Sequence, residues 1–167
     1  MSVTIRRARA EDAGFLFDLM TDEDTRPFLG RAAETRDDVV AEIARSEREP
    51  AAYGRFIVEE DGEPVGTVGF TVENERHRIA EVGRFAIHPR FRGRRIGDEA
   101  ARAFQRHMLV DLGFHRIELQ IYAFNERAIA HAERSGFVRE GVKRRAYFRD
   151  GRWQDAVLFS LLEDELA

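Results

Sequence analysis

A change in hydrophobic period between Glu81 and Leu112 constrains the fold more than any other feature of the sequence. Up to His88 the residues alternate as in a β-strand and form two sets that point to opposite sides: Val82, Ala86 and His88 in one, Gly83, Phe85 and Ile87 in the other. Pro89 ends this strand because proline has no N–H group to give to a ladder. Further on, apolar residues recur at helical spacing, at Ile96, Ala100, Ala103, Phe104 and Met108. This stretch therefore predicts a strand and a helix joined by a short loop.

The loop is rich in arginine and glycine and reads Arg92, Gly93, Arg94, Arg95, Ile96, Gly97. The first N–H groups of a helix have no partner inside it, and the helix dipole places partial positive charge there. The two glycines leave space for a phosphate close to the backbone, and the arginines add positive charge around it. We expect this loop to bind a pyrophosphate group.

Composition limits the class of protein. A chain of 167 residues is long enough for one domain with a proper core and short for two, so we expect residues 1–167 to form a single domain. The absence of cysteine excludes disulfides and thiolate catalysis. No apolar run has the length of a membrane span or a signal-peptide core, which predicts a cytoplasmic protein without a membrane partner. The net charge of −4 argues against nucleic-acid binding, and the histidines show no metal-ligand spacing.

The rest of the chain predicts further helices and strands. Asp61-Gly62 and Asp150-Gly151 are hairpin turn signals. The remaining expected strands are Val3–Arg7, Phe56–Glu60, Val65–Val72, Ile117–Ile121, Val138–Phe148 and Trp153–Leu162. The remaining expected helices begin at Glu11-Asp12, at a Thr35 cap and at an Asn125 cap, and Thr21–Ala33 is expected to be a loop.

The arginine and glycine loop resembles the acetyl-coenzyme A (acetyl-CoA) site of the GNAT superfamily of N-acetyltransferases, whose loop reads Arg/Gln-x-x-Gly-x-Gly/Ala. Arg92 fits the first position and Gly97 the last, whereas Arg95 replaces the middle glycine. The predicted order of elements is also that of the GNAT fold, so the resemblance covers nearly the whole chain. It implies an α/β (α+β) domain with a central mixed, mostly antiparallel sheet of about seven strands, flanked by about four helices.

In the GNAT fold the strand that carries Glu81–His88 and the next strand splay apart, and the pantetheine arm of acetyl-CoA lies between them. An unpaired strand edge can bind such an extended amide chain through its backbone groups. The resemblance therefore implies these cofactor-binding residues: Phe85, Ala86, Ile87, Arg92, Gly93, Arg94, Arg95, Ile96, Gly97 and Asn125.

A second segment, residues 125–137, resembles the superfamily signature Asn-x-x-Ala-x-x-x-Tyr-x-x-x-Gly-Phe. Asn125, Ala128, Gly136 and Phe137 match it, but Ala132 stands at the tyrosine position. In the family that tyrosine is thought to protonate the departing thiolate. Asn125 is also a plain helix N-cap, and the two roles are compatible.

The reaction also needs a base, because a primary amine with a pKa of about 10 is protonated at neutral pH. Glu81 is the first candidate, since superfamily members with a glutamate base carry it at the start of this strand; a solvated strand-end glutamate is the alternative. His88 and His131 are further candidates for the base. Tyr122 and Tyr147 are candidates to replace the missing acid, or else packed aromatics.

Acidic residues are frequent in the region that borders the acceptor site in this fold: Asp22, Glu23, Asp24, Glu34, Asp37 and Asp38. They are expected on a solvated surface, where they could also attract a cationic amine.

The closing segment Tyr147–Asp155 resembles the ribosomal-protein N-terminal and polyamine acetyltransferases of the superfamily. The expected function is transfer of an acetyl group from acetyl-CoA to a primary amine by direct attack in a ternary complex, with Glu81 and Asn125 as catalytic residues. The acceptor is a protein α-amine or a small polyamine. The alternatives are a catalytically silent acetyl-CoA-binding module and an interaction protein of the same fold. The sequence does not determine the oligomeric state, and a homodimer is one possibility.

Overall fold

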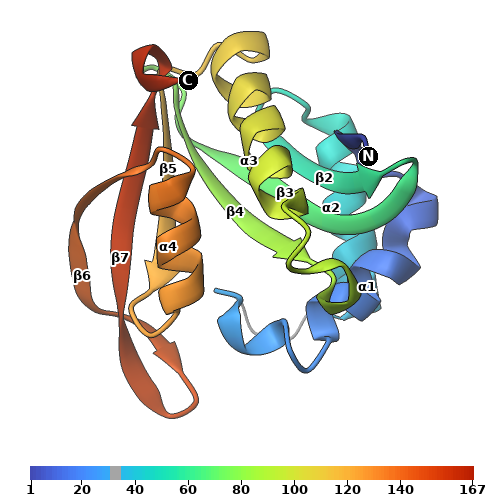
Figure 1. Ribbon diagram of the computed structural model, residues 1–167, viewed down its shortest axis with the longest axis horizontal. Helices are drawn as coiled ribbons and strands as arrows, with labels where there is room; N and C mark the ends of the chain where they lie inside the picture. Colours follow the sequence, from blue (N-terminus) through green and yellow to red (C-terminus); the bar gives the residue numbers. More distant parts are fainter. Residues whose placement is uncertain (31–34) are drawn as a thin grey trace.

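The computed structural model describes residues 1–30 and 35–167 as a single α/β domain (Figure 1). Its seven strands are β1 (Val3–Arg7), β2 (Tyr53–Glu60), β3 (Glu63–Asn74), β4 (Ile79–Ile87), β5 (Arg116–Tyr122), β6 (Val138–Arg149) and β7 (Arg152–Leu162). The α-helices of the described part are α1 (Ala13–Thr21), α2 (Arg36–Arg48), α3 (Ile96–Arg106) and α4 (Glu126–Arg134). The predicted fold class is confirmed, as are the predicted positions of all seven strands.

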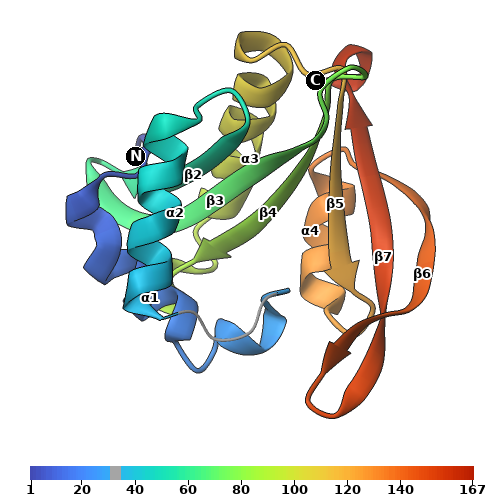
Figure 2. The same ribbon diagram turned by 180° about the vertical axis from the view of Figure 1, so that it is seen from behind.

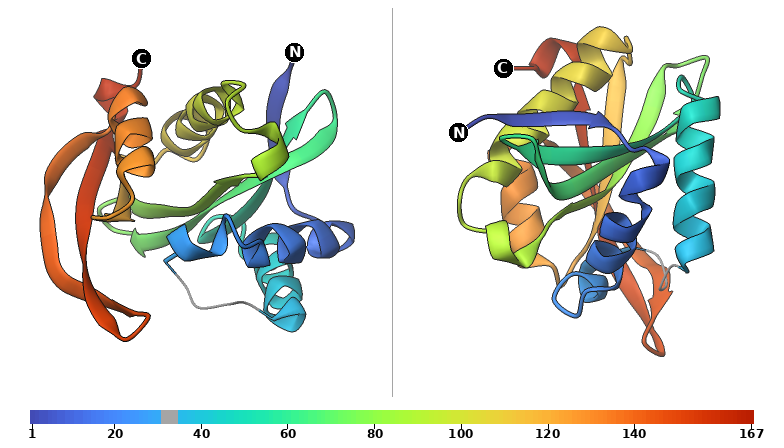
Figure 3. Two further views of the ribbon diagram at one scale, coloured as in Figure 1. Left: turned by 60° about the horizontal axis from the view of Figure 1, so that its bottom comes forward. Right: turned by 90° about the vertical axis from the view of Figure 1, so that its right-hand side faces the viewer.

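The strands form one sheet in the order β1-β2-β3-β4-β5-β7-β6. Only β4 and β5 run parallel, and every other neighbouring pair is antiparallel. Helices α1 and α2 cover one face of the sheet, seen from behind in Figure 2, and α3 and α4 lie on the other face (Figure 3). The prediction of a mixed, mostly antiparallel sheet is correct.

Two apolar clusters hold the layers together. The larger one lies between the sheet and α3, where Phe56, Phe70, Ile96, Phe104 and Met108 are buried. The smaller one joins α1 and α2 to β2, through residues that include Leu16, Val39 and Ile57. The helical spacing of Ile96, Ala100, Phe104 and Met108 thus reflects burial of one helix face, as predicted.

Strand β4 departs from the predicted alternation because it contains a β-bulge. Gly83 pairs with Gly69 and Ala86 with Thr67, so that two residues of β4 lie opposite one residue of β3. Arg84 takes up the extra length with a φ of +53°. As a result Val82 packs in the same cluster as Phe85 and Ile87, whereas simple alternation assigned Val82 to the opposite face.

The helix after the loop changes from α-helical to π-helical near its end. The α-helical part stops at Arg106 and continues as a π-helical turn, His107–Asp111, in which the N–H of Leu112 bonds to the carbonyl of His107. The wider turn brings both Met108 and Leu109 into the core. Periodicity alone did not distinguish this turn from regular helix.

Candidate functional site

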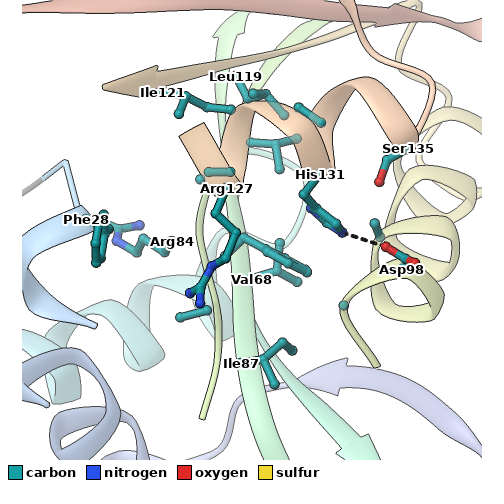
Figure 4. Close-up of a pocket in the computed structure, with 18 of the residues that line it drawn as sticks. Phe28, Val68, Arg84, Ile87, Asp98, Leu119, Ile121, Arg127, His131 and Ser135 are labelled. Carbon is teal, nitrogen blue, oxygen red and sulfur yellow. Dashed lines mark ion pairs between the residues drawn. The ribbon is translucent and has the colours of Figure 1, made fainter. Parts of the chain in front are cut away.

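The sheet opens between β4 and β5. Their ladder joins Ile79–Glu81 to Arg116–Glu118, and the described residues form no further pairs between the two strands. From Val82 and Leu119 onward the strands diverge, and α4 lies over the gap (Figure 1). A cavity of about 580 Å³ fills the divergence, between β4, β5, α3 and α4 (Figure 4). The predicted splay is therefore present.

The wall of this cavity on the β4 side contains the segment Phe85–Ile87, as expected. The ring of Phe85 stacks on the ring of His131 from α4, with centroids 5.3 Å apart. Burial lowers the pKa of His131, although Asp98 lies 3.3 Å from its Nε2 atom and opposes this effect. The imidazole of His131 is therefore packed between Phe85 of β4 and Asp98 of α3 and forms part of this wall.

The loop before α3 has the backbone of an anion site. Gly93 has a φ of +78°, and Arg95, the N-cap of α3, has a φ of +63°. These left-handed residues turn the chain so that the first N–H groups of α3 begin at the edge of the cavity, which Gly93, Arg95, Ile96 and Gly97 line. A Cβ atom at Gly93 would meet no atom within 4 Å. The surroundings of Gly93 therefore leave space for a ligand beside the backbone.

The arginines of the loop have different surroundings. Arg92 donates from Nε to the carbonyl of Ile87 (3.1 Å) and from Nη2 to Thr25 Oγ1 (3.1 Å), so its side chain braces the end of β4. Arg94 points away from the cavity and pairs with Glu60 at 3.1 Å. Arg95 lines the cavity and is exposed. Arg94 is thus the one predicted cofactor-binding residue that does not line the cavity.

Helix α4 supplies the opposite wall of the cavity. Asn125 caps the helix, with its Oδ1 atom accepting from the N–H of Ala128 at 3.2 Å, and it lines the cavity together with Ala132. Ala132 is only 4% exposed and belongs to the core cluster. Arg127 also lines the cavity and lowers the pKa of Arg92, after the larger effect of burial. Sequence reasoning did not select Arg127, although it stands between two residues of the matched signature.

A second cavity, of about 290 Å³, lies against the first and shares six lining residues with it: Phe28, Gly30, Val82, Gly83, Arg84 and Gln120. Its walls include the aromatic side chains Phe28, Phe70, Tyr122 and Tyr147. Glu81 lines this second cavity and not the first. The two cavities therefore meet where β4 and β5 begin to diverge.

Glu81 is held by Gln120, whose Nε2 atom donates to Oε2 of Glu81 at 3.2 Å. Burial raises the pKa of Glu81 above its ordinary value of 4.5, and the neighbouring carboxylate of Glu73 adds to this shift. A carboxylate with a raised pKa accepts a proton more readily, which suits a general base. The role of Gln120 was not predicted from the sequence. The alternation of residues along β5 shows on which face of the sheet Gln120 lies, but it does not show which residue its side chain contacts.

The other candidates lie elsewhere. The Nδ1 atom of His88 accepts from the N–H of Arg90 at 3.2 Å, and the residue lines neither cavity. Asp22 caps a turn by accepting from the N–H of Asp24 at 2.9 Å, and Asp38 forms a capping box with Thr35 at the start of α2. Glu34 lies outside the described residues.

Within residues 1–30 and 35–167, no helix is long and apolar enough to cross a membrane. In the same part of the chain, no group of His, Asp and Glu side chains is placed to hold a metal ion.

Comparison with known proteins relates the whole chain to acetyltransferases. The family model described as "Acetyltransferase (GNAT) domain" matches residues 2–138. The SPbeta prophage-derived uncharacterized N-acetyltransferase YokL of Bacillus subtilis is 26% identical over 170 residues, which cover 98% of this chain and 92% of that protein. A putative ribosomal N-acetyltransferase of the same organism is 30% identical over 105 residues, 63% of this chain and 57% of that protein.

A solved structure gives the same result for the fold. The crystal structure of spermidine N-acetyltransferase from Vibrio cholerae in complex with CoA and spermine superposes with a TM-score of 0.88. The match covers 98% of this chain and 97% of that chain at 25% sequence identity.

Proposed function

The chain belongs to the GNAT acetyltransferase family, and from this premise we propose that it transfers the acetyl group of acetyl-CoA to a primary amine within a ternary complex. One observation supports the proposal above all others: two cavities meet where β4 and β5 diverge, at Gly83 and Gln120. The larger cavity suits the cofactor, and the smaller one suits the acceptor. The meeting point is where an amine and a thioester could come into contact.

The larger cavity fits an extended phosphate-bearing cofactor. The diphosphate would bind to the N–H groups of the loop at Gly93–Gly97, with positive charge nearby on Arg95 and Arg127. The edge of β4 at Phe85–Ile87, which forms no ladder with β5 in the described part of the chain, would pair with the amides of the pantetheine arm. Asn125, which caps α4 beside this edge, would contact the same arm.

In the proposed reaction Glu81 takes a proton from the ammonium group of the acceptor, directly or through water. The neutral amine then forms a bond from nitrogen to the carbonyl carbon of the thioester, and backbone N–H groups of β4 stabilise the oxyanion. The C–S bond breaks, the nitrogen releases its second proton to solvent, and Glu81 afterwards returns the first proton to solvent. Because a thiol has a pKa of about 8.5, its thiolate can leave and take a proton from solvent. No tyrosine at position 132 is then required.

The smaller cavity favours a small amine as acceptor. Its volume of about 290 Å³ and the carboxylate of Glu81 suit a short cationic chain, and Glu73 adds a second negative charge nearby. The solved relative that carries spermine in its crystal supports a polyamine-like acceptor. A protein α-amine is the second candidate, supported by the similarity to a putative ribosomal N-acetyltransferase.

An acceptor screen tests the proposal. Polyamines, amino acids, aminoglycosides and short peptides are supplied with acetyl-CoA, and release of free CoA is measured. We expect release with at least one primary amine. Binding of acetyl-CoA in a calorimeter without release on any acceptor would instead indicate a silent binding module, and absence of both heat and thermal stabilisation would indicate an interaction protein.

Glu81→Gln tests the role of the base. We expect kcat to fall by about 100-fold, since general base catalysis typically contributes this much or more. The affinity for acetyl-CoA should stay the same, because Glu81 does not line the larger cavity. Glu75→Gln is the matched control, in an exposed turn before β4. Unchanged turnover and an unchanged pH profile in the Glu81 variant would remove Glu81 from the mechanism.

A further inference from the structure

Three side chains from three strands form a continuous hydrogen-bonded chain across the open end of the sheet. The hydroxyl of Tyr147 on β6 donates to Oε1 of Gln120 on β5. The Nε2 atom of Gln120 then donates to Oε2 of Glu81 on β4 at 3.2 Å. All three side chains line the smaller cavity, next to the point where it meets the larger one. The two hydrogen bonds therefore connect the two halves of the sheet across the gap, at the proposed reaction centre.

We infer that Gln120 is a positioning residue for acetyl transfer: the hydroxyl of Tyr147 fixes its amide, and the amide in turn holds the carboxylate of Glu81 toward the acceptor cavity. The inference rests on the proposed function in one respect, the role of Glu81 as the base.

The direction of the amide follows from the chemistry of its neighbours. A glutamine amide has one acceptor end and one donor end, while an ionised carboxylate can only accept. Burial raises the pKa of Tyr147, and the nearby charge of Glu81 adds to this, so the phenol keeps its proton and can donate. With the Tyr147 hydroxyl on Oε1, the N–H₂ group must face Glu81. Without that hydroxyl the amide can rotate and present its oxygen to the carboxylate, which is repulsive.

The fold brings these residues together in two ways. Glu81 and Glu118 are the last paired residues of β4 and β5, and Gln120 lies two residues further on the same face of β5. On β6 an irregularity between Lys143 and Tyr147 shifts the register with β7. There Arg145 has a φ of +50°, and its N–H donates to Asp155 Oδ1 at 2.7 Å. Beyond it Tyr147 is partly buried, while Phe148 is 63% exposed.

Other charged groups near Glu81 also affect its pKa, and the test has to take them into account. Glu73 on β3 and Glu118 on β5 raise the pKa of Glu81, after burial, while Lys143 on β6 and the hydrogen bond from Gln120 lower it. Glu118 itself is paired with Arg116 at 2.7 Å. Loss of the Gln120 donor should therefore raise the pKa of Glu81 further, with the other groups unchanged.

The first test is a carboxyl ¹³C NMR titration of cofactor-free protein, with the Glu81 resonance assigned from Glu81→Gln. We expect the pKa of Glu81 to rise in Gln120→Met and in Tyr147→Phe. Gln154→Met is the matched control: Gln154 is the register partner of Tyr147 on β7 and lines neither cavity, so the pKa should not move. An unchanged pKa in both test variants would overturn the inference even if acetyl transfer were established. Tyr147→Phe keeps the test valid if Gln120→Met does not fold.

The second test measures kcat and KM against pH with an acceptor from the screen. In both test variants we expect the acid limb of kcat/KM to move to higher pH by the same amount as the NMR shift. We expect kcat to fall about tenfold or more, since small errors in placement slow bound reactants strongly. The KM for acetyl-CoA should not change in Tyr147→Phe, because Tyr147 does not line the larger cavity. If the pKa of Glu81 shifts in the two variants but kcat/KM does not change, the contact between Gln120 and Glu81 has no role in the reaction. That result would overturn the inference.

These tests separate the inference from the proposed base. If Glu81→Gln retains full turnover, the base assignment fails, and the NMR titration still shows whether Gln120 and Tyr147 act on Glu81.

Discussion

Arg95 has the least favourable backbone conformation among the residues of the proposed diphosphate loop. Its φ of +63° lies in the left-handed region, which costs an L-residue roughly 1–2 kcal/mol. The GNAT loop motif that this loop resembles, Arg/Gln-x-x-Gly-x-Gly/Ala, has glycine at this position. The conformation expected of a glycine is thus retained here with an arginine in its place, and the substitution does not prevent the backbone from forming the turn.

Arg95→Gly should therefore stabilise the protein relative to Arg95→Ala. Both variants lose the same charge, but only glycine removes the Cβ atom from the left-handed position. Allowing for the greater flexibility of glycine in the unfolded chain, we expect a difference of about 0.5–1 kcal/mol. Urea unfolding without cofactor measures it. Equal stability of the two variants would show that Arg95 is not strained.

Asp12 is a second residue whose surroundings make a clear prediction. Arg6 donates to both of its carboxylate oxygens, at 2.8 and 2.9 Å, and the N–H of Arg9 donates at 2.7 Å. Burial alone would raise the pKa of Asp12, but the bonds from Arg6 and Arg9 outweigh it and lower the pKa below its ordinary 3.8. The ionised carboxylate therefore stabilises the folded state.

Asp12→Asn should lower the free energy of unfolding by about 1.5–3 kcal/mol at pH 7, the usual contribution of hydrogen bonds to charged groups. Because the folded pKa is depressed, the stabilisation is present above about pH 4 and is lost as the pH falls through the folded value. The difference between variant and wild type should thus shrink in acid. Urea unfolding at several pH values checks this, with the exposed Asp18→Asn as control.

At the scale of helices and strands, the N-terminus of α3 leaves space for a ligand next to its first residues. A Cβ atom at Gly97 would lie 3.5 Å from Nε2 of His131 and 3.8 Å from the ring of Phe85, which are ordinary contact distances. The protein itself therefore does not require glycine at this position. A diphosphate close to the backbone would require it.

Gly97→Ala separates these two requirements. We expect the stability without cofactor to stay the same or to rise by up to about 1 kcal/mol, because alanine is the better helix former. We expect the affinity for acetyl-CoA to fall about tenfold, equivalent to about 1.4 kcal/mol. Gly14→Ala in α1 is the control, with the same change in a helix away from both cavities. Unchanged affinity would mean that the cofactor does not approach Gly97.

The bulge in β4 is the other element on which the site depends. Arg84 holds it from the opposite face, with Nη1 donating to the hydroxyl of Tyr53 at 2.9 Å and Nη2 pairing with Glu42 of α2 at 2.7 Å. The bulge turns Phe85 toward α4 and places Gly83 where the two cavities meet. Helix α2 thus supports the β4 wall of the larger cavity without lining that cavity.

At the scale of the whole molecule, the sheet consists of two parts joined by a short parallel ladder. Outside that ladder, Gln105 of α3 bonds to the carbonyl of Ser135 at 2.9 Å, and Asp98 pairs with Arg134 at 3.0 Å. Arg149 of β6 donates to the carbonyl of Leu29 and so ties the hairpin to the segment after α1. A ligand in the gap would add contacts to both parts.

Binding of acetyl-CoA should therefore stabilise the molecule and protect the free edge of β4. At a concentration 100 times the Kd we expect about 2.7 kcal/mol of added stability. Hydrogen exchange should slow at Phe85–Ile87, while the amides of Phe56–Val58, in a strand paired on both sides, should not change. Stabilisation without protection at Phe85–Ile87 would place the cofactor elsewhere.

Local sequence patterns were enough to predict the order of the elements and the position of the loop. Proline, glycine and hydrophobic period act locally, so they predicted β1 at Val3–Arg7 and the turns at Asp61-Gly62 and Asp150-Gly151. The resemblance to the GNAT fold also predicted the splay between β4 and β5, and nine of the ten predicted cofactor-binding residues, all except Arg94, line the larger cavity.

The contacts between side chains of different strands and loops could not be predicted from the sequence and became clear from the folded protein. Three such contacts are the bond of Arg84 at the bulge to Tyr53, the pairing of Arg94 with Glu60, and the link from Tyr147 through Gln120 to Glu81. Their hydrogen bonds join residues that lie 27 to 39 positions apart in the sequence. Local patterns carry no information about such partners, because register, bulges and burial set them. The physical reason is that hydrogen bonds between strands depend on the assembled sheet and not on the spacing of residues along one strand.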